Sequence, residues 1–457
     1  MSIINPCPFC HEKQEEINRL KDELICLKDR LRHRERTEKE GFFGSSTPSS
    51  QKPVKVNTQE KPKKPRGAKD GHKGFGRKAL RFSDADHVER VETRELCPEC
   101  GNPLEVKGDE HRSVLDSHPV KAEKILYLLE KKWCRRCGKT FRAEPPGVLP
   151  KNLYGNQLMA NAAVMHYLHG IPVGRVCEQL GIGDGALLNI FHRMAKLFSG
   201  IVPKLIEEYR QSPVKHADET SWRTNGKNGY AWLFATPKMS IFLFKKTRSA
   251  SVPREVFGKE RLPGILVVDR YTGYNKMPCT IQYCYSHLLR EVEDIAKEFP
   301  DQAEALAFVS SVAPLLALAM GLRHQPISDD QFSQQTIKVK TEIKALMESP
   351  ARHMAIRRVQ DIFTENEGRL YHWAEKRTVP AENNLAERDL RPTVIARKVS
   401  FGSQSDGGAY SRGVLMTVMH TLKKRGVDVA ACLKYTLDQL AKDISMNPFD
   451  LLSLHPP

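Results

Sequence analysis

An apolar, β-branched run that ends in an acid places the strongest constraint on this chain. The segment GILVVD, which ends at Asp269, has the composition of a buried strand. A buried strand normally carries a carboxylate at its tip only where that carboxylate is used. Asp218 in VKHADETSW and Glu387 in ENNLAERDLR have equally distinctive settings. An acid on a first strand, another on a later strand and a third on a distant helix predict a shared site.

The residues around the two aspartates predict most of a sheet. From Lys215 to about Lys246 three segments alternate like strands (VKHADETSW, GYAWLFAT and SIFLFKK), and NGKNG forms the first hairpin turn. RLPGILVVD adds a further strand. Three consecutive strands, a fourth and a late helix are the pattern of a ribonuclease-H-like α/β fold. In that fold the first and fourth strands are neighbours, so we expect Asp218 and Asp269 at one edge.

A long helical insertion separates the second aspartate from the glutamate. Glu387 lies on a predicted helix that places Asn383 and Asn384 on the same face. Glu382 is an alternative third acid, although its position beside Pro380 is typical of a helix start. The expected segments are the first part of the catalytic core at 211–298, the insertion at 299–375, the catalytic helix region at 376–400 and a C-terminal helical region at 401–457.

The three acids predict a two-metal site that cuts phosphodiester bonds. Two Mg²⁺ (or Mn²⁺) ions about 4 Å apart require oxygen ligands, and Asp218, Asp269 and Glu387 provide them. In such a site one ion activates water or a 3′-hydroxyl, and the other stabilises the leaving oxygen. These acids are therefore both the predicted catalytic residues and the predicted magnesium ligands.

Cysteine spacing predicts a zinc-ribbon-like module at 91–150. Six of the eleven cysteines form three C-x-x-C pairs. The two pairs that flank a strand-like segment, AEKILYLLEKKW, can supply four thiolates and close a tetrahedral structural zinc site. Its ligands would be Cys97, Cys100, Cys134 and Cys137. A redox dithiol would need only one pair. Three possibilities remain open for Cys7 and Cys10. They could bind a zinc together with His11 and another ligand, bind one together with the same pair across a dimer, or bind no metal.

The N-terminal region combines a heptad pattern with a basic linker. In the coiled coil expected at 1–40, apolar residues recur at Ile17, Leu20, Leu24, Leu27 and Leu31. This pattern predicts a homodimer contact; an amphipathic helix packed on its own protein is the alternative. In the flexible linker expected at 41–90, nine Lys or Arg residues and one acid between 61 and 81 can lie along phosphates. The expected contacts are Lys63, Lys64, Arg66, Lys73, Arg77 and Lys78.

Residues 151–210 predict a helix-turn-helix region that binds DNA. NQLMANAAVMHYLHG is amphipathic, Pro172 opens a second helical segment, and a third follows Gly181. Three packed helices without a DNA contact would give a similar pattern. The basic stretch upstream favours the DNA-binding interpretation.

Overall charge and hydropathy restrict the class of protein. The net charge is +17 and the pI is about 9.3, so the field of the chain attracts a polyanion, with nucleic acid as the expected partner. No apolar stretch is expected to reach the roughly 18 residues of a membrane span, and no leader opens the chain. These features predict a soluble protein of the bacterial cytoplasm, associated with the nucleoid.

Several of these motifs together resemble a known family. HADETSW, VVDRYTGYN, ENNLAERDLRP and KVSFGSQSDGGAYS are similar to segments of the transposases of the IS66 group of bacterial insertion sequences, in the wider DDE class. The likeness also covers the heptads, GHKGFGRK and the paired C-x-x-C module, so it spans nearly the whole chain. It implies an Asp-Asp-Glu triad at Asp218, Asp269 and Glu387. Where the family often has Asp-Asn-Asn, this chain has Glu382-Asn383-Asn384, and the triad stays intact.

The resemblance implies a transposase that binds its terminal inverted repeats and transfers strands to target DNA, with helper proteins from the same element. Cys284 and His287 resemble a C-x-x-H element of several DDE transposases, in which the histidine would contact DNA; a buried Cys and a core His are the alternative. Arg388, Arg391 and Arg397 are further expected DNA contacts. A non-catalytic DNA-binding regulator and a structure-selective nuclease of the same fold are the rival functions.

Overall fold

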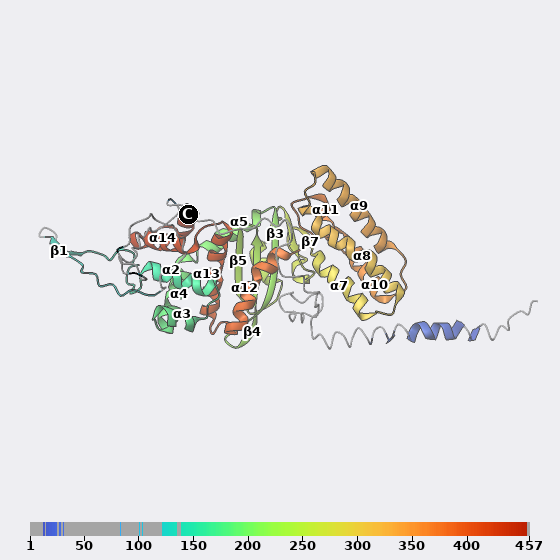
Figure 1. Ribbon diagram of the computed structural model, residues 1–457, viewed down its shortest axis with the longest axis horizontal. Coiled ribbons are helices and arrows are strands. Elements are labelled where there is room, and N and C mark those ends of the chain that lie inside the picture. Colours follow the sequence, from blue (N-terminus) through green and yellow to red (C-terminus); the bar gives the residue numbers. More distant parts are fainter. Residues whose placement is uncertain are drawn as a thin grey trace, which may run out of the picture. The chain divides into compact units, whose positions relative to one another are not determined.

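The computed structural model describes residues 12–13, 15–24, 27–28, 31, 83, 100, 103, 121–134 and 139–454, with the backbone alone at 134, 139–142 and 453–454. The chain divides into two units, Met1–Pro53 with Ala122–Pro457, and Val54–Lys121. The helices and strands from β1 onward belong to the first unit (Figure 1). The basic-stretch residues Lys63, Lys64, Arg66, Lys73, Arg77 and Lys78 lie outside the described residues.

A mixed five-stranded sheet forms the centre of the described structure, with strand order β5-β4-β3-β6-β7. β3 pairs antiparallel with β4, and β4 with β5, whereas β6 is parallel to both β3 and β7. The four predicted strands are confirmed, and β7 was missed. The bounds are β3 Val214–Thr224, β4 Lys227–Thr236, β5 Met239–Lys245, β6 Ile265–Val268 and β7 Thr280–Tyr283.

Two local features fix how these strands meet. The β3–β4 turn consists of Asn225 and Gly226, with φ of 50° and 71°, as a two-residue hairpin requires. At the start of β6, Gly264 has φ of 78°, and a Cβ there would lie 2.4 Å from the carbonyl oxygen of Pro213. Glycine therefore lets β6 approach β3 closely, and the amide of Ile265 donates to that carbonyl at 2.9 Å.

Helix α13 (Asp406–Lys424) covers β5, the strand at one edge of the sheet. Edge strands leave backbone groups without strand partners. Here the amide of Phe242 donates to the hydroxyl of Thr417 at 2.9 Å, and the amide of Ser240 to that of Thr421 at 3.2 Å. α13 begins at Asp406, within the helical region predicted at 401–457, because Ser405 caps its N-terminus and accepts from the amide of Gly408.

The helices that precede and follow the sheet pack around α13. α4 lies against α13, and α2 lies against α14. The three helical segments predicted between 151 and 210 are present, and the first ends in a π-helical turn, η3; their assignment as a DNA-binding helix-turn-helix stays a prediction. The bounds are α2 Asn156–Ala163, η3 Val164–Leu168, α3 Val173–Leu180, α4 Asp184–Phe198, α5 Ile201–Gln211, α14 Val429–Lys442 and α15 Pro448–Leu454.

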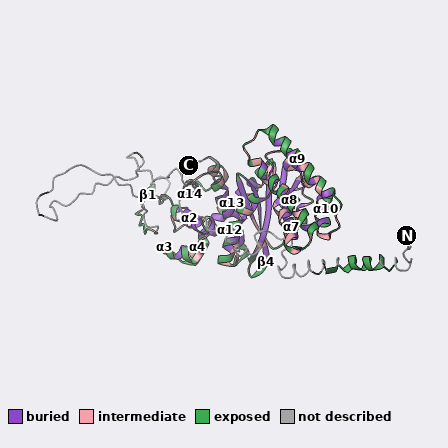
Figure 2. Ribbon diagram, turned by 45° about the vertical axis from the view of Figure 1, so that its right-hand side comes forward, coloured by how far each residue is buried: buried purple, intermediate pink, exposed green. Residues whose placement is uncertain are grey.

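The insertion predicted at 299–375 is helical, and no strand occurs between 284 and 383. Buried residues line the inner faces of these helices and the sheet (Figure 2). The bounds are α6 Ser251–Phe257 and η4 Thr272–Tyr274 before β7, and then α7 Tyr285–Glu298, α8 Ala303–Gly321, η5 Leu322–His324, α9 Asp329–Glu348, α10 Met354–Glu365, η6 Glu367–Arg369, α11 His372–Glu375 and α12 Asn384–Ser400.

One expectation about membrane spans was wrong. Among the described helices, the one at Ala303–His324 is long and apolar enough to cross a membrane, judged by length and composition alone. It packs against α7 and α9, and Val312 and Leu316 are fully buried there. A core helix of a soluble protein passes the same test of composition, so this helix is weak evidence for a membrane.

The zinc-module and heptad regions are described in part. β1 (Lys131–Cys134) and β2 (Lys139–Arg142) form an antiparallel hairpin. The predicted strand AEKILYLLEKKW is mostly wrong, since residues 121–130 form no strand. The described residues between 12 and 31 are helical, and their apolar side chains are exposed, from 44% at Ile17 to 58% at Leu31.

Candidate active site

The sheet brings the two predicted aspartates together. β3 and β6 pair in parallel from Val214 with Ile265 to His216 with Val267. The same register continued by two residues sets Asp218 opposite Asp269. Both are buried, with only 5% and 2% of their surface exposed. Asp218 on β3 and Asp269, which directly follows β6, therefore lie opposite each other on neighbouring strands.

Backbone amides hold one oxygen of each aspartate. Oδ1 of Asp218 accepts a hydrogen bond from the amide of Glu219 at 2.8 Å, and Oδ1 of Asp269 accepts one from the amide of Tyr271 at 2.9 Å. Oδ2 of Asp269 is buried and has no hydrogen-bond partner among the described residues. A buried carboxylate oxygen without a partner is costly, and a cation would satisfy it.

Burial and mutual repulsion disfavour the charged forms of both acids. Burial, followed by the charges of Glu219, Asp269 and Glu387, raises the pKa of Asp218 well above its usual range. Burial, followed by the charge of Glu219, raises the pKa of Asp269 to about 7. The amide of Tyr271 and the cations of Arg248 and Arg270 partly oppose this second shift. The surrounding protein thus does not fully stabilise the ionised carboxylates, and a bound cation would do so.

Glu219 is a buried acid that sequence reasoning missed. It follows Asp218 on β3, so its side chain points to the other face of the sheet. Its side chain is fully buried, Nε and Nη2 of Arg248 lie 2.8 and 2.7 Å from Oε1, and the hydroxyl of Tyr274 donates to Oε2 at 2.6 Å. Arg248 therefore forms its ion pair with Glu219. Nη2 of Arg270 donates to Oε1 and Oε2 of Glu291 at 2.6 and 2.7 Å.

Glu387 enters the same region from the first turn of α12. Its charge is among those that raise the pKa of Asp218. Among the described residues, the one ion pair that reaches these three acids joins Arg290 Nη2 to Glu387 Oε1 at 3.7 Å. That oxygen is buried and accepts no hydrogen bond. Asp269 and Glu387 each have a buried carboxylate oxygen that accepts no hydrogen bond, and no ion pair among the described residues neutralises Asp218. These three carboxylates suit hard divalent cations, which prefer carboxylate ligands.

The alternative acid, Glu382, has a different environment. It lines a cleft of about 630 Å³ together with Arg323, His324 and Arg388. Burial raises the pKa of Glu382, and a backbone hydrogen bond and the side chains of Arg323, His324 and Arg388 partly oppose this shift. The charge of Glu387, and not that of Glu382, is among the main causes of the raised pKa of Asp218.

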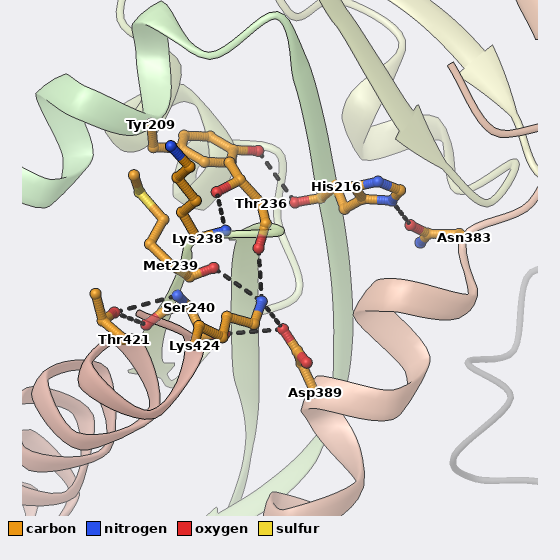
Figure 3. A network of polar contacts seen from close by, with 10 residues as sticks. All are labelled: Tyr209, His216, Thr236, Lys238, Met239, Ser240, Asn383, Asp389, Thr421 and Lys424. Atoms are coloured by element: carbon orange, nitrogen blue, oxygen red, sulfur yellow. Dashed lines mark hydrogen bonds and ion pairs between the residues drawn. The ribbon is translucent and has the colours of Figure 1, made fainter. Parts of the chain in front are cut away.

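Polar contacts at both ends attach α12 to the sheet. The side chain of Asn383 donates to the carbonyl of Ala217 and pairs with the ring of His216, both at 2.9 Å. Asp389 accepts from Ser240 at 2.8 Å and forms an ion pair with Lys424, which also donates to two carbonyls of the β4–β5 turn (Figure 3). Nη1 of Arg397 donates to the carbonyl of Ser221 at 2.7 Å. These contacts fix the helix that carries Glu387.

Known proteins similar to this chain identify its family. The family model for "Transposase IS66 family" matches residues 151–411, which is more than half of the chain and includes all three acids. The chain belongs to the IS66 transposase family. A second model, the zinc-finger binding domain of transposase IS66, matches residues 94–138. This confirms the resemblance inferred from the sequence motifs.

Relatives of this IS66-family transposase include two proteins of Sinorhizobium fredii. Uncharacterized protein y4qI is 26% identical over 426 residues, covering 83% of this chain and 76% of the relative. Uncharacterized protein y4jD is 23% identical over 421 residues, covering 82% and 80%. The similarity extends over most of each chain and is not limited to one domain.

The zinc-finger match includes all four predicted zinc ligands of the transposase, which indicates a structural zinc. Cys100 is exposed and forms no disulfide, and β1 ends at Cys134. Cys97, Cys137 and the side chain of Cys134 lie outside the described residues, as do Cys7 and Cys10. The donor set of four cysteines suits zinc and leaves no open coordination position.

The predicted C-x-x-H element lies at the acid cluster of the transposase. Cys284 is the N-cap of α7, and His287 lies in its first turn; both are buried, with 0% and 5% exposed. Burial raises the pKa of the Cys284 thiol to about 12, with a further contribution from Glu387. The two side chains are therefore buried, as the alternative interpretation expected. Their proximity to Glu387 was not foreseen.

The three predicted arginine contacts of the transposase differ in their surroundings. Arg388 and Arg391 are exposed on α12. Arg397 donates through Nη1 to β3, and burial lowers its pKa. Its structural role is to hold α12, whereas a DNA contact by any of the three stays a prediction.

Proposed function

We propose that this IS66-family transposase binds the terminal inverted repeats of its insertion sequence and cuts and joins DNA at Asp218, Asp269 and Glu387. Two observations support this proposal: the register of β3 and β6 sets Asp218 opposite Asp269, and the charge of Glu387 on α12 contributes to the raised pKa of Asp218. The strand order β5-β4-β3-β6-β7, with only β4 antiparallel to its two neighbours, supports a ribonuclease-H-like core.

The acids would hold two Mg²⁺ or Mn²⁺ ions. When bound, these ions supply Lewis-acid activation of the attacking oxygen and stabilisation of the leaving oxygen. The chain provides the fixed geometry: amides orient Asp218 and Asp269, and the contacts of Asn383, Asp389 and Arg397 hold Glu387 against them. Such preorganisation reduces the rearrangement needed during reaction.

Two phosphodiester reactions would follow at this site. In the first, water attacks the phosphorus at the element's end, the bond to the 3′ oxygen breaks, and a 3′-hydroxyl is released. In the second, that hydroxyl attacks a target phosphodiester, a new ester forms and the target's own 3′ oxygen leaves. Each step exchanges one P–O bond for another, so neither requires an external energy source.

DNA binding would involve several parts of the chain. The zinc-finger match and the net charge of +17 support DNA as the partner. α4 exposes Asn189 and Lys196, and Arg388 and Arg391 lie exposed on α12. The basic stretch would add Lys63, Lys64, Arg66, Lys73, Arg77 and Lys78, while Arg397 and the buried His287 would contact DNA near the acids.

Partners and location follow from the same proposal. The exposed heptad residues between Ile17 and Leu31 favour a homodimer. Helper proteins encoded by the same element are expected from the family. The protein would act in the bacterial cytoplasm, on nucleoid DNA.

A strand-transfer assay with full-length protein tests the proposed function. With end DNA, target DNA and Mg²⁺, Asp218→Asn and Asp269→Asn should each lower joining by at least about 100-fold, the scale for loss of one preorganised electrostatic contact. Asp330→Asn, an exposed acid at the start of α9, is the matched control and should behave like the wild type. Unchanged joining by Asp269→Asn would exclude the assigned site, and cutting without joining would favour a nuclease.

A further inference from the structure

Cys284, His287 and Glu387 form a group of potential metal ligands that the acid triad does not explain. The first two belong to the start of α7, and Glu387 belongs to the first turn of α12, about a hundred residues later. One ligand atom of each lies within 4.8 Å of the others, and the described residues contain no other such group. The three atoms therefore come from two elements that are far apart in the sequence.

We propose that Cys284, His287 and Glu387 bind a thiophilic divalent cation of the zinc class, beside the Mg²⁺ ions and sharing the carboxylate of Glu387 with them. The donor set is one sulfur, one imidazole nitrogen and one carboxylate oxygen. Zinc accepts all three donor types, whereas Mg²⁺ selects oxygen ligands. Three protein ligands leave a fourth tetrahedral position open for water or a phosphate oxygen.

Local structure suits a metal at this position. Cys284 precedes the N-terminus of α7, where the helix dipole partly offsets the effect of burial on its thiol. Its sulfur accepts a hydrogen bond from the amide of Asn383 at 3.1 Å, which orients it from the α12 side. Oε1 of Glu387 is buried and accepts no hydrogen bond, and its arginine partner is 3.7 Å away.

The required adjustment is small. Ligand atoms around a tetrahedral zinc lie roughly 3.5 Å apart, given zinc–ligand bonds of about 2.0 to 2.3 Å. The observed limit of 4.8 Å therefore requires closure of about 1 Å. On binding, the neutral thiol of Cys284 would lose its proton to solvent, and the metal–sulfur bond would replace the S–H bond. The bound cation would fix the carboxylate of Glu387 between α7 and α12.

Zinc counting on the full-length protein tests this site. Protein stripped with a chelator is dialysed against buffered Zn²⁺, and zinc per chain is measured by elemental analysis. Cys284→Ser and His287→Asn should each bind about one zinc fewer than the wild type. Cys432→Ser removes a comparably buried cysteine that belongs to no ligand group among the described residues, and should match the wild type. The zinc-finger cysteines contribute equally to all of these proteins.

Cobalt substitution supplies a second readout. The difference spectrum between Co²⁺-loaded wild type and Co²⁺-loaded Cys284→Ser should contain the charge-transfer band of one cysteine–cobalt bond. Circular dichroism identifies any variant that fails to fold, and Glu387→Gln then replaces it in the zinc count. Equal zinc counts in the wild type and in every folded ligand variant would overturn the proposal, as would a featureless difference spectrum. Neither readout depends on transposase activity, so failure here is distinct from failure of the proposed function.

Discussion

Glu219 and Arg248 form a buried ion pair directly behind Asp218. The side chain of Glu219 is fully buried, and that of Arg248 is 25% exposed. Arg248→Met would leave a buried charge without its partner, so we expect the free energy of unfolding to fall by about 3 kcal/mol. Urea denaturation would measure it, with the exposed Arg254→Met as control.

The double variant Glu219→Gln with Arg248→Met checks the cause of that loss. Because it removes the uncompensated charge, it should recover part of the stability lost in Arg248→Met. A double variant less stable than both single variants would contradict the assignment.

A buried histidine makes stability depend on pH. Burial, followed by the charge of Arg412, lowers the pKa of His166 to about 4. An unfolded chain, with a histidine pKa near 6.5, binds more protons between pH 4 and 6.5, so stability falls as pH falls through this range. At pH 5.5 the loss from His166 should be about 1 kcal/mol relative to pH 7.5.

Urea denaturation at pH 7.5 and 5.5 would show the effect of His166. His166→Asn should lose about 1 kcal/mol less than the wild type on acidification. His169→Asn changes an exposed histidine next to the same helix and is the control. An identical pH dependence for the wild type and His166→Asn would contradict the prediction.

Individual acids were predictable from the sequence where their local pattern was unusual. Asp269 ends a continuous apolar strand, and Asp218 interrupts a strand with buried neighbours, so both stood out. Glu219 did not, because an acid next to Asp218 has no distinguishing spacing. Its partner Arg248 lies in the loop after β5, and only tertiary packing brings the two together.

At the scale of elements, α13 stabilises the sheet by covering the β5 edge. Thr417→Val would leave the amide of Phe242 buried without an acceptor, which should cost about 1 to 3 kcal/mol of unfolding free energy. Thr436→Val is a matched control, since the equally buried hydroxyl of Thr436 donates to a carbonyl of its own helix at 2.9 Å. Equal effects of the two changes in urea denaturation would argue against the edge contact.

Elements with a regular pattern were predictable, and those set by context were not. The β3–β4 hairpin followed from Asn225-Gly226 between alternating segments. The start of α13 lies in a segment with Gly407 and Gly408, which have low helix propensity, and the Ser405 cap and packing against β5 sustain a helix there. The segment AEKILYLLEKKW has strand composition, but only its last residues find a partner strand.

At the scale of the whole molecule, the exposed heptad residues predict that the transposase is a dimer. Light scattering should give the intact chain twice its 51.8 kDa mass, and deletion of residues 1–40 should give a monomer. A chain carrying Leu20→Ala and Leu24→Ala offers a milder test and should dissociate at higher concentration than the wild type. A monomeric mass for the intact chain would contradict the predicted dimer.

The central claim is that acids from three separate elements form one metal-dependent active site. Mg²⁺-dependent cleavage of end DNA by Glu387→Gln and Glu382→Gln tests it most directly, because these acids lie near one another in sequence but have different surroundings. We expect Glu387→Gln to lose at least about 100-fold in rate and Glu382→Gln to stay within a few-fold of the wild type. Full activity of Glu387→Gln together with loss in Glu382→Gln would contradict the site described here.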